Sequence, residues 1–203
     1  MKMHRIDIDL ISEYSDCDIY IRNNSNSEYV LINNDLNWLC DTQIKSDAIQ
    51  KQFFVSLDDQ IKVIQRKQLR LNSDLKKSIN VDIQKARTVL NKIVEVTLSE
   101  PRTSILQNIK DTVTLIVNEY HSNPKVIEHL TQVSLHDYST HLHLTNVMLF
   151  CIGYAKSCNM DDDMIKLYGM MGLMHDIGKT SIPDYILQAP RKLTIDEMEL
   201  IKQ

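Results

Sequence analysis

The sequence predicts a mainly α-helical protein that begins with a small α/β module. Glycine and proline are scarce, at four each in 203 residues, so few positions would interrupt a helix. Apolar residues recur at helical spacing from about residue 57 onward, whereas short β-like runs precede that point. We therefore expect an α/β regulatory module over residues 1–56, connecting helices over 57–122 and a helical domain over 123–203.

The first 56 residues are expected to form a hairpin and one further strand. Their β-branched and aromatic runs flank a stretch of Asn and Ser that favours a turn. The expected elements are strand 18–22, turn 23–27, strand 28–33, a short helix near 41–51 and a strand at 52–56. Ser56 is then a suitable N-cap for a helix that begins at Leu57.

Breaks in the helical pattern divide the rest of the chain. Pro101 and Pro124 each mark a boundary, because proline is tolerated at the start of a helix and not in its interior. Thr194 and Glu197 have the spacing of a capping box at the start of the last helix. The expected helices are a connecting helix from Leu57, then 81–98, 101–121, 125–133, 138–158 and 161–175, a short segment between 182 and 190, and a helix from Thr194.

Charge and hydropathy narrow the class of partners. The formal net charge is −4, which argues against a broad surface for a nucleic acid polymer. The first residues lack the apolar core of a signal peptide, and no run reaches the roughly 18 apolar residues that a membrane helix needs. We expect a cytoplasmic protein with no membrane partner.

Three chemically active side chains lie together at His175, Asp176 and Lys179. Neighbouring helix residues project about 100° apart, so His175 and Asp176 can reach one object only if it lies near the backbone, as a metal ion does. Imidazole suits first-row transition metals, and a carboxylate can bridge two ions. Lys179 follows one turn later and could hold a phosphate oxygen as a point charge. The alternatives are a helix-terminal pair with a capping role and a lysine that interacts with the helix dipole.

A further ligand is expected from the preceding helix, where His141 and His143 are the candidates. These two histidines are two positions apart and so face different sides of a helix. His143 lies on an apolar stripe that we expect to face the core, with Val147, Phe150 and Tyr154. His141 shares its side with Thr145, Met148 and Ile152, which are also mostly apolar. Periodicity leaves both histidines open, and a lone histidine on such a stripe is ordinarily a core residue.

Longer motifs around these residues resemble a known family. The runs that carry the resemblance are Asp137–Val147, Gly172–Lys179, Ile182–Asp184, Ile186-Leu187, Pro190 and Leu193–Glu197. They are similar to the HD-GYP subfamily of the HD superfamily of metal-dependent phosphohydrolases, over about residues 130–203. The resemblance implies an all-α HD-type helical domain, of which this chain would hold the N-terminal part.

The resemblance also implies an activity and a set of roles. HD-GYP proteins hydrolyse the bacterial messenger cyclic di-GMP by attack of a metal-activated hydroxide on phosphorus. Position by position, His143, His175 and Asp176 would be metal ligands, with Asp176 bridging two ions, and Lys179 would contact a substrate phosphate. His175, Asp176 and Lys179 would be the catalytic residues, and iron or manganese the metals. Some members carry a glutamate for a third metal where this chain has Ser139, so two ions are expected.

The resemblance stops where the family's remaining metal ligands and its Gly-Tyr-Pro segment would follow. We therefore expect that the 203-residue chain is inactive as it stands and belongs to a longer catalytic domain. One alternative is a catalytically inactive HD-like module for signalling or protein interaction, and another is an HD phosphohydrolase for a different nucleotide. A homodimer through the N-terminal module or the connecting helices is also consistent with the sequence.

Overall fold

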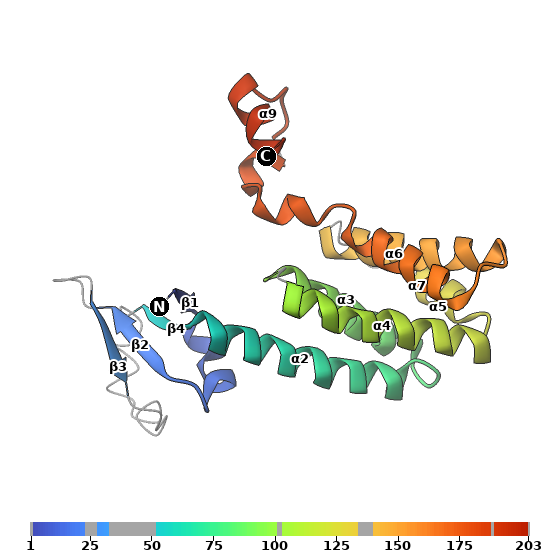
Figure 1. The fold of residues 1–203 in the computed structure, drawn as a ribbon, viewed down its shortest axis with the longest axis horizontal. Coiled ribbons are helices and arrows are strands. Elements are labelled where there is room, and N and C mark those ends of the chain that lie inside the picture. The colour runs from blue at the N-terminus through green and yellow to red at the C-terminus, as the bar shows by residue number, and fades with distance from the viewer. Residues whose placement is uncertain are drawn as a thin grey trace. The chain divides into compact units, whose positions relative to one another are not determined.

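The computed structural model describes residues 2–22, 28–32, 52–100, 103–133, 140–187 and 189–202 (Figure 1). The chain divides into two compact units, Met1–Arg66 and Lys67–Gln203, and each is described by itself. The predicted fold class is confirmed, because a small antiparallel sheet is followed by helices. The expected turn at 23–27, the helix near 41–51, Pro101 and Ser139 lie outside the described residues.

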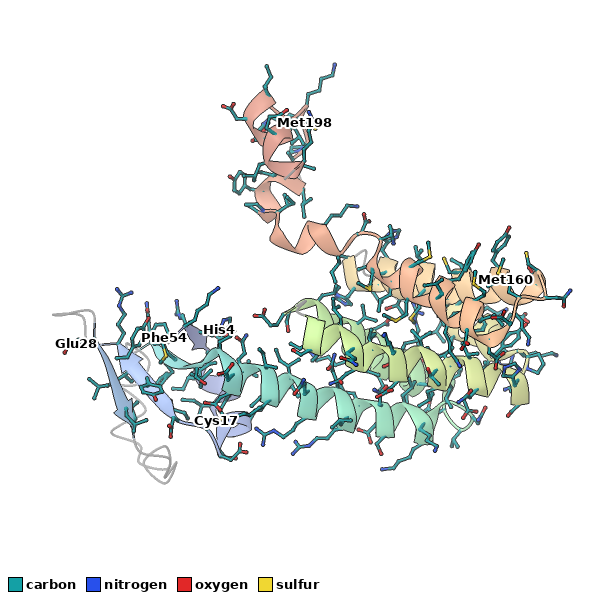
Figure 2. All side chains as sticks on the ribbon, viewed as in Figure 1. His4, Cys17, Glu28, Phe54, Met160 and Met198 are labelled. Carbon is teal, nitrogen blue, oxygen red and sulfur yellow. The ribbon has the colours of Figure 1, made fainter. Side chains whose placement is uncertain are left out.

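The N-terminal unit contains a four-stranded sheet in which all neighbouring strands are antiparallel. Its order is β1-β4-β2-β3, with β1 at Met3–Ile6, β2 at Ile19–Arg22, β3 at Tyr29–Ile32 and β4 at Phe53–Ser56. The predicted hairpin is the β2–β3 pair, and the predicted strand at 52–56 is β4. All four residues of β4 are buried, among them Phe54, which is labelled in Figure 2. The ring of Phe54 packs edge-on against that of Tyr29, with ring centroids 5.0 Å apart.

Two elements of this unit are absent from the sequence-based expectation. Strand β1 has only one buried residue, Ile6, and carries His4 and Arg5, so it shows no clear alternation. The 3-10 helix η1, Ile8–Tyr14, is too short for a helical period to be visible. The core that these elements share is formed by Ile6, Ile11, Tyr14, Cys17, Ile19, Phe53, Val55 and Val63.

Helix α2, Leu57–Ser78, begins at the predicted N-cap. The backbone N–H of Asp59 donates to Ser56 Oγ at 3.1 Å, and Ser56 Oγ donates to the Asp59 carboxylate at 2.7 Å. Gln68 interrupts the apolar pattern of this helix and is nevertheless buried. Its amide donates to Thr97 Oγ1 at 2.9 Å and to the carbonyl of Ile105 at 3.2 Å, so the buried polar group is satisfied.

The C-terminal unit is a set of helices around one apolar core, and the predicted helix positions agree closely with the observed ones. The helices are α3 at Ile83–Leu98, α4 at Thr103–Ser122, α5 at Val126–Gln132, α6 at Thr140–Ser157 and α7 at Asp162–Met174. The 3-10 helix η3 at Ile177–Ser181 follows, then α8 at Asp184–Leu187 and α9 at Ile195–Ile201. Within the described residues, no helix combines the length and the apolar character that crossing a bilayer requires.

Helices α6 and α7 pack closely because two glycines of α7 face α6. A Cβ atom on Gly172 would lie 2.9 Å from Cys151 Sγ and 3.0 Å from the carbonyl oxygen of Val147. A Cβ atom on Gly169 would lie 2.8 Å from the side chain of Ile152. Larger residues at either position would push the helices apart, so the glycines set the separation of α6 and α7.

The predicted core-facing stripe through His143 is wrong. Phe150 and Tyr154 are 62% and 60% exposed, whereas Met148 and Ile152, on the other side of α6, are fully buried. Helix α6 carries apolar residues on nearly every side, so their spacing does not define which side faces the core. His143 therefore lies on the more exposed side of α6, where a ligand can reach it.

Candidate metal centre

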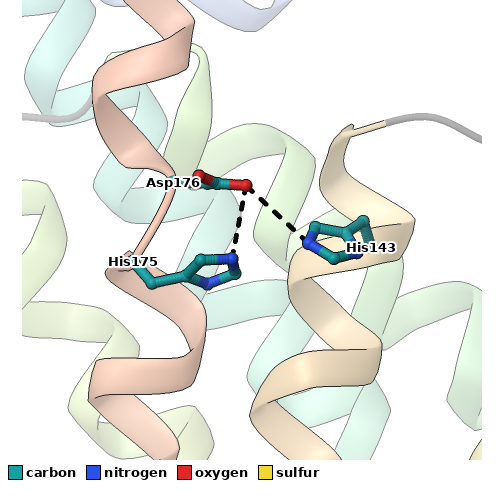
Figure 3. A group of neighbouring side chains, drawn as sticks. All are labelled: His143, His175 and Asp176. Carbon is teal, nitrogen blue, oxygen red and sulfur yellow. Dashed lines mark ion pairs between the residues drawn. The ribbon is translucent and has the colours of Figure 1, made fainter.

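Three side chains with metal-binding atoms meet beside the ends of α6 and α7. His143 comes from the start of α6, and His175 and Asp176 follow the last residue of α7 (Figure 3). Each offers one ligand atom, and these atoms all lie within 4.8 Å of one another. No other cluster of this kind is present among the residues that the structure describes.

Asp176 Oδ2 is the atom on which the cluster converges. It lies 3.3 Å from His175 Nε2 and 3.7 Å from His143 Nε2 (Figure 3). Two donor atoms bound to one transition metal at about 2.1 Å each are roughly 3–4 Å apart, so both distances suit a shared ion. Two imidazoles and one carboxylate are also a donor set that iron, manganese and zinc accept.

The end of α7 explains how two neighbouring residues can face the same point. His175 is the C-cap of α7, and Asp176 then adopts φ −113° and ψ 12°, outside the regular helical region. This bridge conformation is sparsely populated and recurs at functional sites. The change of direction turns the Asp176 carboxylate toward the side of His175 that faces α6.

The ring of His175 is oriented by the backbone of its own helix. His175 Nδ1 lies 2.8 Å from the carbonyl oxygen of Gly172. Because a carbonyl only accepts, Nδ1 carries a proton, and Nε2 is the ring nitrogen that remains to bind a metal ion. Histidines that bind metals commonly donate their second nitrogen in this way, so the arrangement fits a metal ligand.

Lys179 lies at the same carboxylate oxygen. Its Nζ donates to Asp176 Oδ2 at 2.6 Å, from one turn further along in η3. This hydrogen bond lowers the pKa of the Asp176 carboxyl, against the opposing effect of burial and with help from the positive charge of the Lys179 ammonium. Asp176 is therefore ionised at neutral pH, as a metal ligand must be.

The structure brings together the four residues that the sequence predicted for the site, which are His143, His175, Asp176 and Lys179. It also distinguishes His143 from the alternative, His141. His143 belongs to the cluster, and its ring centroid lies 5.3 Å from that of His175. His141 lies outside the cluster, on the side of α6 that carries buried Thr145. The contribution of Gly172, which supplies both the carbonyl and the close helix contact, was missed because neither role leaves a spacing pattern in the sequence.

Several curated proteins are similar to part of this chain. Cyclic di-GMP phosphodiesterase PA4108 of Pseudomonas aeruginosa is 33% identical over 81 residues, which are 40% of this chain and 20% of that protein. The cyclic di-GMP phosphodiesterase response regulator RpfG of Xanthomonas campestris is 37% identical over 49 residues, or 24% of this chain and 13% of that protein. A cyclic di-GMP phosphodiesterase of Thermotoga maritima is 35% identical over 80 residues, or 39% and 22%.

The two other comparisons give no match or a weaker similarity. No family model matches the chain. The solved structure of Bd1817, described as an HD-GYP protein from Bdellovibrio bacteriovorus, aligns with a TM-score of 0.47 and 17% identity over 99% of this chain and 68% of that one. The chain spans only 13–22% of the length of the curated relatives it matches. Over that shared part, the predicted resemblance of this chain to proteins named cyclic di-GMP phosphodiesterases is confirmed.

Proposed function

We propose that this chain is part of a metal-dependent phosphodiesterase that hydrolyses cyclic di-GMP in bacterial second-messenger signalling. The observation that carries the proposal is the convergence of His143, His175 and Lys179 on the carboxylate of Asp176. The substrate is supported by the curated relatives, each of which is named a cyclic di-GMP phosphodiesterase. A module that only binds proteins would need no imidazole lone pair, carboxylate and ammonium at one point.

In this proposal, His143, His175 and Asp176 hold the metal centre. A divalent ion there supplies Lewis acidity toward a phosphodiester oxygen and lowers the pKa of water. His143 Nε2 and His175 Nε2 are the nitrogen ligands, and the Gly172 carbonyl keeps His175 in the required tautomer. Asp176 has two carboxylate oxygens and can contact two ions.

Lys179 is the proposed substrate-binding residue. Its ammonium lies at the metal-facing oxygen of Asp176 and is half exposed, so it can turn from the carboxylate to a phosphate oxygen. A lysine binds phosphate as a compact positive charge and offsets the negative charge of the substrate. His175, Asp176 and Lys179 would then be the residues closest to the chemistry.

The finer features of the proposal are predictions. They are two ions of iron or manganese, a cytoplasmic location, no binding of nucleic acid polymers or membranes, and a homodimer through the N-terminal module or the connecting helices. The module over residues 1–56 would regulate a domain that begins near residue 123 and follows connecting helices over 57–122. The present chain is expected to bind metal weakly and to show no turnover.

Metal binding and hydrolysis test this function together. In the natural protein that contains this sequence, elemental analysis should find about two iron or manganese ions, and cyclic di-GMP should be hydrolysed. His175→Ala should abolish both, because it removes the nitrogen ligand next to Asp176. Retained hydrolysis in His175→Ala would disprove the proposed mechanism.

A matched control is available on α5. His129 is exposed and lies outside the cluster, so His129→Ala removes one imidazole without touching the site. This variant should keep the metal content and the activity of the unsubstituted protein. Equal losses in His129→Ala and His175→Ala would mean that the effect is not specific to the candidate centre.

A further inference from the structure

Arg87 is a buried cation at the boundary of α3 and α6. Its side chain is 2% exposed and is among the largest fully buried side chains among the described residues. Nη2 donates to Asn146 Oδ1 on α6, whereas Nε and Nη1 are buried and have no hydrogen-bond partner among the described residues. Burial lowers the pKa of Arg87 to about 10, so the guanidinium remains charged at neutral pH.

Such a group is costly for the fold. The free-energy cost of removing a charge from water is normally offset by an opposite charge and by hydrogen bonds at its remaining donors. Among the described residues, Arg87 meets an amide oxygen in place of a carboxylate, and two of its nitrogens have no partner. An apolar side chain of similar length would remove this cost, so the fold gains little from the guanidinium itself. What the guanidinium does provide is a directional, charge-assisted hydrogen bond between two helices.

The acceptor of that hydrogen bond lies close to the metal centre. Asn146 follows His143 by three residues on α6, so the two side chains project from neighbouring positions on the helix surface. His143 itself is exposed, with a side-chain accessibility of 55%. Its position therefore depends on how the first turns of α6 are rotated and placed along the helix axis.

The same part of α6 also packs against α7. Gly172 contacts the backbone of Val147 and Met148, next to Asn146 in the sequence. Apolar contacts of this kind tolerate small rotations, whereas a hydrogen bond loses strength when its geometry changes. A site in which His143 Nε2 must meet an atom on another helix tolerates only a fraction of an ångström.

We propose that Arg87 is a positioning residue for the metal centre: by holding Asn146, it sets the rotation of α6 that presents His143 to Asp176. This inference rests on the proposed metal-binding function. It requires that Arg87 improves metal binding while it fails to improve stability. A purely structural residue would change both properties in the same direction.

Arg87→Met separates these two effects in the 203-residue chain. The variant should bind Mn²⁺ about tenfold more weakly, as substitutions behind a metal ligand usually do. Its thermal midpoint should be equal to or higher than that of the unsubstituted chain, because a poorly paired buried charge has been replaced by an apolar group. Unchanged Mn²⁺ affinity, or a loss of affinity that merely follows a loss of stability, would overturn the proposal.

Asn91→Leu is the matched control. Asn91 lies one turn after Arg87 on α3, is 6% exposed and has an amide group without a hydrogen-bond partner in the described part of the chain. The substitution removes a buried polar group of the same face and leaves the contact between Arg87 and Asn146 in place. Asn91→Leu should keep its Mn²⁺ affinity. An equal loss in both variants would refute a specific role for Arg87.

A double-mutant cycle tests the route through Asn146. Asn146→Ala removes the acceptor and should weaken Mn²⁺ binding by a similar factor. The double variant should lose no more than either single variant, because both changes break one contact. Additive losses would refute the route. If the unsubstituted chain binds no Mn²⁺, the proposed metal site fails together with this inference, whereas unchanged affinity in Arg87→Met overturns the inference alone.

Discussion

The ammonium of Lys179 donates to Asp176 Oδ2 at 2.6 Å, and this is the same oxygen that faces His143 Nε2 and His175 Nε2. Lysine and metal thus need the same atom, and both carry positive charge. A cation that binds Asp176 Oδ2 competes with the Lys179 ammonium for this oxygen and is repelled by its charge. In the proposed function, the displaced ammonium would become available to a phosphate, which would couple metal binding to substrate binding.

Lys179→Met should therefore strengthen Mn²⁺ binding by about tenfold. Removing a unit charge about 5 Å from a divalent ion changes the free energy of binding by roughly 1–2 kcal/mol in a water-like medium. Isothermal titration calorimetry of the 203-residue chain measures the change. Lys166→Met, on α7, makes the same change in net charge at a lysine that pairs with Asp163, and its affinity should stay at the unsubstituted value. Equal affinities in Lys179→Met and Lys166→Met would contradict the competition.

Gly172→Ala should lower the free energy of unfolding by about 1–3 kcal/mol, the usual cost of overpacking. Its Cβ would lie 2.9 Å from Cys151 Sγ and 3.0 Å from a backbone oxygen of α6. Separating α6 from α7 should also weaken Mn²⁺ binding, since the ligands come from both helices. Denaturant unfolding and metal titration check the two effects.

Gly153→Ala is the control for that substitution. Gly153 lies inside helix α6, and among the described residues a Cβ there would meet Ile127 alone, at an ordinary contact distance of 3.6 Å. Alanine should therefore raise the free energy of unfolding by about 0.5–1 kcal/mol through its higher helix propensity. If Gly153→Ala were destabilised as well, any alanine at a glycine of this helix pair would be harmful. The loss in Gly172→Ala would then not be specific to the contact between α6 and α7.

The stability of the first turn of helix α9 should depend on pH. The hydrogen bond from Arg191, together with that from the Thr194 backbone, lowers the pKa of Glu197 from 4.5 to about 2. Since the pKa is depressed in the folded state, the capping box stabilises α9 above pH 4.5, and this contribution is lost as the pH falls toward about 2. NMR spectra of the Met198 amide over this range should report the loss of helix.

Arg191→Gln is the matching variant for the titration. It removes the guanidinium that contacts both Glu197 carboxylate oxygens, at 2.8 and 2.7 Å. The midpoint of the change at Met198 should move upward, toward the ordinary value of a glutamate. The amide signals of core residues on α4 serve as a reference for global unfolding. A midpoint that does not move in Arg191→Gln would rule out this electrostatic cap.

The sequence was sufficient for the elements whose signals are local. Ser56 and Thr194 cap helices where expected, because a capping side chain and its backbone partner lie within three residues. Strand β1 was missed, because its identity depends on pairing with β4 about 50 residues later. Such long-range pairing leaves little trace in a four-residue segment with one buried side chain.

The candidate site could be predicted in its membership and not in its geometry. His175, Asp176 and Lys179 were recognised together because they are neighbours in the sequence. The choice between His141 and His143 required the rotation of α6, which depends on packing against α3 and α7 and not on α6 alone. Arg87 escaped notice, because an arginine in a helix gives no indication that tertiary packing will bury it.

The hydrogen bond between His175 and the Gly172 carbonyl has a consequence for how the site can vary. The group that sets the proton on His175 belongs to the peptide backbone, so no substitution of a side chain can delete it. A histidine held by an aspartate or a glutamine loses its tautomer after one point mutation. Here the tautomer persists for as long as the last turn of α7 persists, and only a change that unwinds that turn would release it.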